Sequence, residues 1–184
     1  MTTTQKIIQS FIIVPLVATT LTMNTFTESV NQAVATMTAA DQITSDAAKV
    51  EREAKAAKID AYYAKYDLPL AGYGMSIVTA AEKYSVDAFL IAGLAMREST
   101  GCKFIIKSTY NCFGWGGGKI KFQSFDHAID TVAMNLGGHS DKTARYYKGK
   151  TLRGILQAYN PPSVVPTYAD EVIAIMNRID NMPV

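Results

Sequence analysis

Residues 86–99 constrain the fold more than any other stretch, because apolar side chains occupy every side of the helix they would form. Between Val86 and Met96 the run reads VDAFLIAGLAM. A helix without a polar face must be buried on all sides. Ser85 is the expected N-cap, with Asp87 in the first turn. We therefore predict a mainly α-helical domain built around one buried helix.

Helical periodicity predicts further helices around this one. They are expected at 75–84, from an N-cap at Ser124 to a stop at Gly137-Gly138, at 151–159 and at 167–182. Residues 100–123 lose the helical period, and 119–122 alternate in the manner of a short strand from a small hairpin. The predicted domain spans 69–184 and carries a small loop or hairpin lobe.

The N-terminal segment, 1–35, is the part of the sequence that indicates the cellular compartment of the protein. Lys6 precedes an apolar run, and 33–35 read Ala-Val-Ala, which is typical of a secretion signal with its cleavage site. One alternative is an uncleaved membrane anchor over 7–23, although polar residues and Pro15 make this run a poor span. A buried core helix is the other. The favoured interpretation predicts an exported protein, either secreted, periplasmic or attached to the cell envelope.

Residues 36–68 are rich in Ala, Lys and Glu and predict a long helical spacer. Lys49/Glu53 and Glu51/Lys55 are opposite charges four residues apart, which stabilises an exposed helix. The apolar stripe expected on this helix is mostly alanine and comprises Val50, Ala54, Ala57, Ala61 and Ala64. We expect a solvated spacer and a monomeric protein; a weak oligomerisation helix is the alternative.

Glu98 is the first candidate for chemistry, because it lies at the C-terminal end of the buried helix. Burial and the negative end of the helix dipole both favour the protonated form of a carboxyl there. A carboxylic acid that stays neutral near neutral pH can protonate a leaving oxygen. The alternative is a structural glutamate paired with Arg97 or a lysine.

Several short elements in this chain resemble those of the lysozyme-like superfamily. AGLAMRESTG at 92–101 resembles its catalytic-helix motif. YNCFGWG at 110–116 and FQSFDHAI at 122–129 are similar to segments of glucosaminidase-type domains and soluble lytic transglycosylases. YNPP at 159–162 and YADEV at 168–172 are similar to their closing elements. The elements occur in the family's order, and 1–68 lie outside the resemblance.

The resemblance implies a lysozyme-like fold and a role for each matching residue. Glu98 would be the general acid and base, and the Tyr168 hydroxyl would orient it. The implied substrate-binding residues are Ser99, Asn111, Phe113, Gly114, Trp115 and Tyr159. Read from the residues alone, the aromatic members could equally be core packing. The implied substrate is the glycan strand of bacterial peptidoglycan.

Acidic residues are absent from 99–125, while four lysines lie there: Lys103, Lys107, Lys119 and Lys121. Two-carboxylate glycosidases need an acid on each side of the bond. The next acids, Asp126 and Asp130, fit the first turn and exposed face of a helix. This favours a single-acid mechanism and leaves lytic transglycosylase or hydrolase open. The lysines would attract acidic stem peptides, or are ordinary solvated side chains.

Cys102 and Cys112 predict a disulfide if the chain is exported, and free thiols if it is not. We expect no cofactor and no metal, because His127 and His139 lack ligand spacing. The net charge of +2 gives no indication of a nucleic-acid partner. Two alternatives to the enzyme remain: an inactive wall-binding domain of the same fold, and an unrelated exported helical protein.

Overall fold

The computed structural model of the chain describes residues 15–106 and 108–184. Its helices are α1 (Pro15–Lys65), α2 (Gly74–Lys83), α3 (Ala88–Ser99), α4 (Phe125–Leu136), α5 (Ala144–Tyr147), α6 (Leu152–Tyr159) and α7 (Tyr168–Asp180). The described residues contain no strand, so the mainly α class is confirmed. The hairpin predicted around 119–122 is wrong, because this segment has no regular partner strand.

The chain divides into two units, 1–48 and 49–184, although α1 is continuous across the division. In the first unit the side chains of 26–37 and 41–48 are exposed. Much of the predicted secretion signal or anchor falls on 1–14, outside the described residues, and it stays a prediction. Over the described part, no helix is both long and apolar enough to span a membrane.

The compact unit begins earlier than the predicted boundary at 69, since the last turns of α1 belong to its core. Ile59, Tyr62 and Tyr63 are buried, whereas Val50 on the predicted stripe is exposed. The solvated-spacer prediction therefore fails for the last turns of α1. The bulky residues at 59, 62 and 63 share one helix face and bury far more apolar surface than the alanine stripe would.

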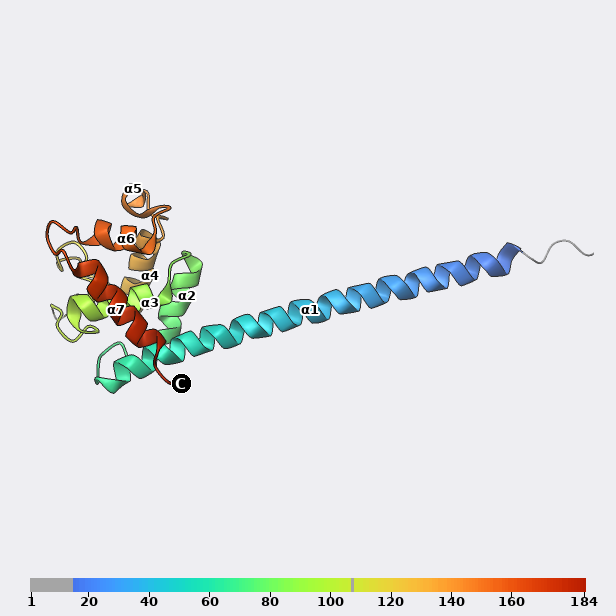
Figure 1. Cartoon of the computed structure of the whole chain (residues 1–184), viewed down its shortest axis with the longest axis horizontal. Coiled ribbons are helices and arrows are strands. Elements are labelled where there is room, and N and C mark those ends of the chain that lie inside the picture. The colour runs from blue at the N-terminus through green and yellow to red at the C-terminus, as the bar shows by residue number, and fades with distance from the viewer. Residues whose placement is uncertain (1–14, 107) are drawn as a thin grey trace, which may run out of the picture. The chain divides into compact units, whose positions relative to one another are not determined.

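Helix α3 is the buried centre of the compact unit, as predicted, and lies among α2, α4 and α7 (Figure 1). Its N-cap is Asp87, whose carboxylate accepts a hydrogen bond from the Phe89 amide. Ser85 instead takes a left-handed backbone conformation (φ 55°) in the turn after α2. At Gly93, α3 has no side chain and α7 packs closely against it, with Met176 beside the Cα.

The remaining predicted helices are present, with bounds shifted by one or two residues. Ser124 caps α4 as predicted, because its hydroxyl accepts a hydrogen bond from the His127 amide. Thr151 caps α6 in the same way. The apolar faces are buried on α4 (Ile129, Val132, Ala133, Leu136) and α7 (Val172, Met176, Ile179). Helix α5 is one turn long and lies where a loop was expected.

Candidate functional site

Glu98 lies in the last turn of α3 and is half-buried. Thr100 caps the C-terminal end of α3 in a left-handed conformation (φ 54°) and turns the chain into the loop lobe. The Tyr168 hydroxyl, at the start of α7, donates a hydrogen bond of 2.5 Å to Glu98 Oε1. On the other side, a Cβ added to Gly114 would lie 2.9 Å from Glu98 Oε2. The carboxyl therefore sits between the start of α7 and the loop lobe.

The Tyr168 side chain is almost fully buried. Burial raises its pKa well above the ordinary value, and the hydrogen bond to Glu98 raises it further. The phenol therefore stays protonated at physiological pH and can act only as a donor toward the carboxylate. A donor fixed in this way orients Oε1 of Glu98, while Oε2 lies on the side of Gly114.

Arg97, the predicted alternative partner of Glu98, is engaged elsewhere. Its Nε lies 2.6 Å from Glu171 Oε2, and its guanidinium lies 5.5 Å from the centre of the Tyr168 ring. The Thr167 hydroxyl donates to the same Glu171 carboxylate, and this bond together with Arg97 lowers the Glu171 pKa. Among residues 15–106 and 108–184, no ion pair involves Glu98.

Aromatic rings gather beside the carboxyl. Tyr159 and Tyr168 stack with ring centres 6.1 Å apart, and the half-buried Trp115 lies 5.7 Å from Tyr159. Burial raises the pKa of Tyr159, and the nearby Glu98 charge raises it further. Tyr147 of α5 joins the cluster, 6.4 Å from Trp115. Tyr147 is not among the predicted site residues, because in the sequence it appears only as part of a Tyr-Tyr pair between two predicted helices.

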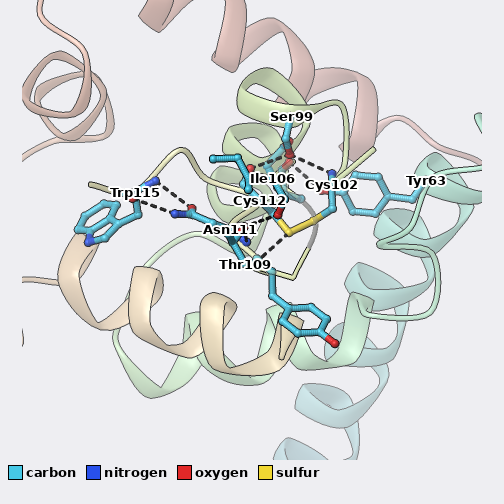
Figure 2. Close-up of a disulfide and its surroundings, with 11 residues drawn as sticks. Tyr63, Ser99, Cys102, Ile106, Thr109, Asn111, Cys112 and Trp115 are labelled. Carbon is cyan, nitrogen blue, oxygen red and sulfur yellow. Dashed lines mark hydrogen bonds between the residues drawn. A yellow bond between two sulfur atoms is a disulfide. The ribbon is translucent and has the colours of Figure 1, made fainter. Parts of the chain in front are cut away.

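Ser99 and Asn111 lie near Glu98 but use their polar groups inside the protein (Figure 2). The Ser99 hydroxyl donates to the Cys112 carbonyl (2.7 Å) and accepts from the Cys102 amide (2.9 Å). The Asn111 amide nitrogen donates to the carbonyls of Trp115 (2.8 Å) and Ile120 (3.0 Å), while its oxygen accepts from the Trp115 amide. Both residues thus hold the loop in shape, in place of the predicted contact with sugar.

Phe113 also differs from its predicted role. Its side chain is completely buried, so it packs in the core and presents no surface to a ligand. Its carbonyl accepts a hydrogen bond from the Tyr159 hydroxyl, which ties α6 to the loop. Of the three predicted substrate-binding residues at 113–115, Gly114 and Trp115 lie next to Glu98 or the aromatic cluster.

The predicted disulfide between Cys102 and Cys112 is present, and both residues are buried. It closes the loop that begins three residues after Ser99 and ends next to Phe113. Figure 2 shows Tyr63 beside Cys102, while the Trp115 ring points away from the disulfide. The bond therefore fixes the loop backbone from which Gly114 and Trp115 extend.

The two acidic residues that follow the loop lobe in sequence, Asp126 and Asp130, are engaged or exposed on α4. Asp126 is exposed in the first turn of α4. Asp130 binds Lys83 (2.8 Å) and accepts a hydrogen bond from the Tyr84 hydroxyl (3.0 Å). In the described part of the chain, no three His, Cys, Asp or Glu side chains gather as metal ligands would.

Neither the protein-family models nor the curated proteins searched match this chain. The resemblance to the lysozyme-like superfamily therefore stays a prediction, and the chemistry is argued from geometry. Two surface depressions, of about 530 and 360 Å³, include neither Glu98 nor its neighbours among their lining residues. The candidate site consists of the half-buried Glu98 carboxyl, the Tyr168 phenol donor and the rings of Tyr159, Trp115 and Tyr147.

Proposed function

We propose that this protein cleaves the β-1,4-glycan strands of bacterial peptidoglycan, with Glu98 as its single general acid and base. One observation carries the proposal: the Glu98 carboxyl ends a buried helix, remains half-exposed, and receives a hydrogen bond from Tyr168 while Arg97 pairs with Glu171. A structural glutamate would be expected to pair with a nearby cation. A positioned carboxyl with one free oxygen is what proton transfer requires.

In the proposed reaction, Tyr168 holds Oε1, and Oε2 on the Gly114 side carries the proton. Glu98 gives this proton to the glycosidic oxygen as the C–O bond breaks. The carbonyl oxygen of the sugar's own N-acetyl group bonds to the anomeric carbon in place of a second carboxylate. Glu98, now a base, takes a proton from the muramoyl 6-hydroxyl or from water. That oxygen then displaces the N-acetyl oxygen from the anomeric carbon.

The aromatic rings support a sugar as the ligand. Sugar rings have apolar faces, and Trp115 offers a half-buried indole beside Tyr159 at the same site. Gly114 brings backbone rather than a side chain next to the carboxyl, which leaves space for a reacting group. We also propose export of the protein, which the buried disulfide supports, because such bonds persist in oxidising compartments.

The test measures clearing of a cell-wall suspension by the purified full chain and by Glu98→Gln. We expect Glu98→Gln to lower the rate by about 10²–10⁴-fold, because it removes the transferable proton. Glu53→Gln is the matched control, since Glu53 is exposed on α1 and only pairs with Lys49. Clearing by both substituted proteins, or by none of the three, would contradict the proposal.

Mass spectrometry of the released fragments identifies the reaction. Anhydro-muropeptides indicate a lytic transglycosylase, whereas reducing ends indicate a hydrolase with muramidase or glucosaminidase specificity set by the terminal sugar. If the native protein binds walls without releasing fragments, and Glu98→Gln binds equally well, the chain is an inactive wall-binding domain.

A further inference from the structure

The loop closed by the disulfide carries an apolar tip that the glycan chemistry does not use. Phe104 is 71% exposed and Ile106 is 61% exposed, while Ile105 between them packs partly against the core. Two neighbouring large apolar side chains turned to solvent cost solubility and commonly mark an interaction site.

The tip is held in place on both sides. The Phe104 amide donates to the Ser99 carbonyl (2.9 Å), and the Thr109 hydroxyl donates to the Ile106 carbonyl (2.7 Å). The disulfide joins the two ends of the loop. Phe104 and Ile106 are thus presented outward by a braced loop, so they bind a surface without a large loss of conformational entropy.

The charged side chains of this loop and of the segment bonded to it are all positive. Lys103, next to Phe104, is exposed, and Lys119 and Lys121 are exposed on the segment that bonds to this loop through the Phe122 amide and the Thr109 carbonyl (2.8 Å). No acidic residue occurs in 99–125. Positive charge around an apolar tip is complementary to a surface that is negative outside and apolar beneath.

We propose that Phe104 and Ile106 insert into the headgroup boundary of an anionic lipid bilayer, with Lys103, Lys119 and Lys121 placed to pair with lipid phosphates. A specific protein partner normally needs about 800 Å² on each side, which two side chains at a loop tip do not supply. Weak, reversible membrane binding needs only a few inserted apolar groups together with basic residues. The binding does not depend on Glu98.

The test uses the full chain and vesicles of phosphatidylcholine with or without phosphatidylglycerol. The double substitution Phe104→Ser/Ile106→Ser should weaken binding to the anionic vesicles about tenfold. Val164→Ser is the matched control, because Val164 is 69% exposed in the loop before α7. Glu98→Gln should bind as the native chain does. Equal binding by the double substitution and the native chain would overturn the proposal.

A second measurement reports on the loop itself, whatever other part of the chain meets the vesicle. Phe104→Trp adds an indole to a chain that has one other tryptophan, Trp115. Lipids brominated on their acyl chains should quench Phe104→Trp more strongly than the native chain or Val164→Trp. Quenching no greater than that of the native chain would show that the loop tip does not enter the acyl chains and would refute lipid insertion.

Discussion

Gly114 is the point where loop backbone meets the Glu98 carboxyl. Its φ of 61° lies in the left-handed region that favours glycine, and a Cβ would lie 2.9 Å from Glu98 Oε2. The residue thus meets a conformational and a spatial requirement at once. The resemblance implied that Gly114 binds substrate, whereas its close approach to the Glu98 carboxyl appears only in the structure.

Gly114→Ala should lower the rate of wall clearing by about 10²-fold, because a methyl group would displace the carboxyl by a fraction of an ångström or more. Gly117→Ala is the matched control: Gly117 has a similar φ of 68°, but its Cβ would meet nothing within 4 Å. The measurement is the initial clearing rate of both variants, with urea denaturation of each. Equal losses of activity would assign the effect to backbone strain alone.

Ser99 and Asn111 show that residue type alone does not determine which group a polar side chain bonds to. The resemblance predicted both as substrate-binding residues, but a polar side chain at such a position can face a ligand or the backbone. The structure turns both toward the loop, which contains many carbonyls and amides without helical partners. Satisfying those groups is obligatory when they are buried, and a sequence does not reveal which side chain does it.

At the scale of elements, the turn between α1 and α2 is the place where the two helices pack most closely. Gly74 begins α2 directly against α1, where a Cβ would lie 2.2 Å from the Ala56 carbonyl oxygen. The Asp60 carboxylate accepts hydrogen bonds from the amides of Gly72 and Gly74, both at 2.8 Å. The turn between the helices is therefore bound to the side of α1.

Gly74→Ala should destabilise the fold by about 1–3 kcal/mol, because neither backbone can move away without breaking these bonds. Gly154→Ala is the control within a helix: its Cβ would meet only the Thr151 hydroxyl and the Lys150 side chain, none closer than 3.3 Å. It should leave stability unchanged or raise it by up to about 1 kcal/mol. Urea titrations of both variants measure the difference, and equal stability of the two would contradict this packing.

Periodicity predicted α2, α3, α4, α6 and α7 to within a few residues, because each buries one strongly apolar face or is buried all round. It misjudged α1, whose inward face is set by Tyr62, Tyr63 and Ile59, while alanines suggested another face. It also read 119–122 as a strand from alternation alone. In both cases the outcome depends on which other segment packs against the element, and only the tertiary fold determines that.

For the molecule as a whole, four phenols that are fully or partly buried link stability to alkaline pH. Burial is the main cause that raises the pKa of Tyr63, Tyr147, Tyr159 and Tyr168. In the unfolded chain these groups titrate near pH 10. Their contribution to stability is therefore complete below about pH 10 and is lost as the pH rises toward the folded values.

The free energy of unfolding should accordingly fall steeply above about pH 10, with the last phenolate absorbance near 295 nm appearing together with loss of helical circular dichroism. Parallel titrations of absorbance and ellipticity measure this. If every tyrosine ionised near pH 10 while the helices persisted, the buried environment of these rings would be refuted.

The end of α1 also determines where this protein can be cut. The Tyr63 hydroxyl donates to the Ala92 carbonyl in the middle of α3, and the Tyr63 ring borders Gly101 at the entrance to the loop lobe. A fragment that begins near residue 69 would lack Tyr63, and with it this hydrogen bond and this ring contact. A fragment designed to keep the compact unit whole must therefore start upstream, at about Lys49.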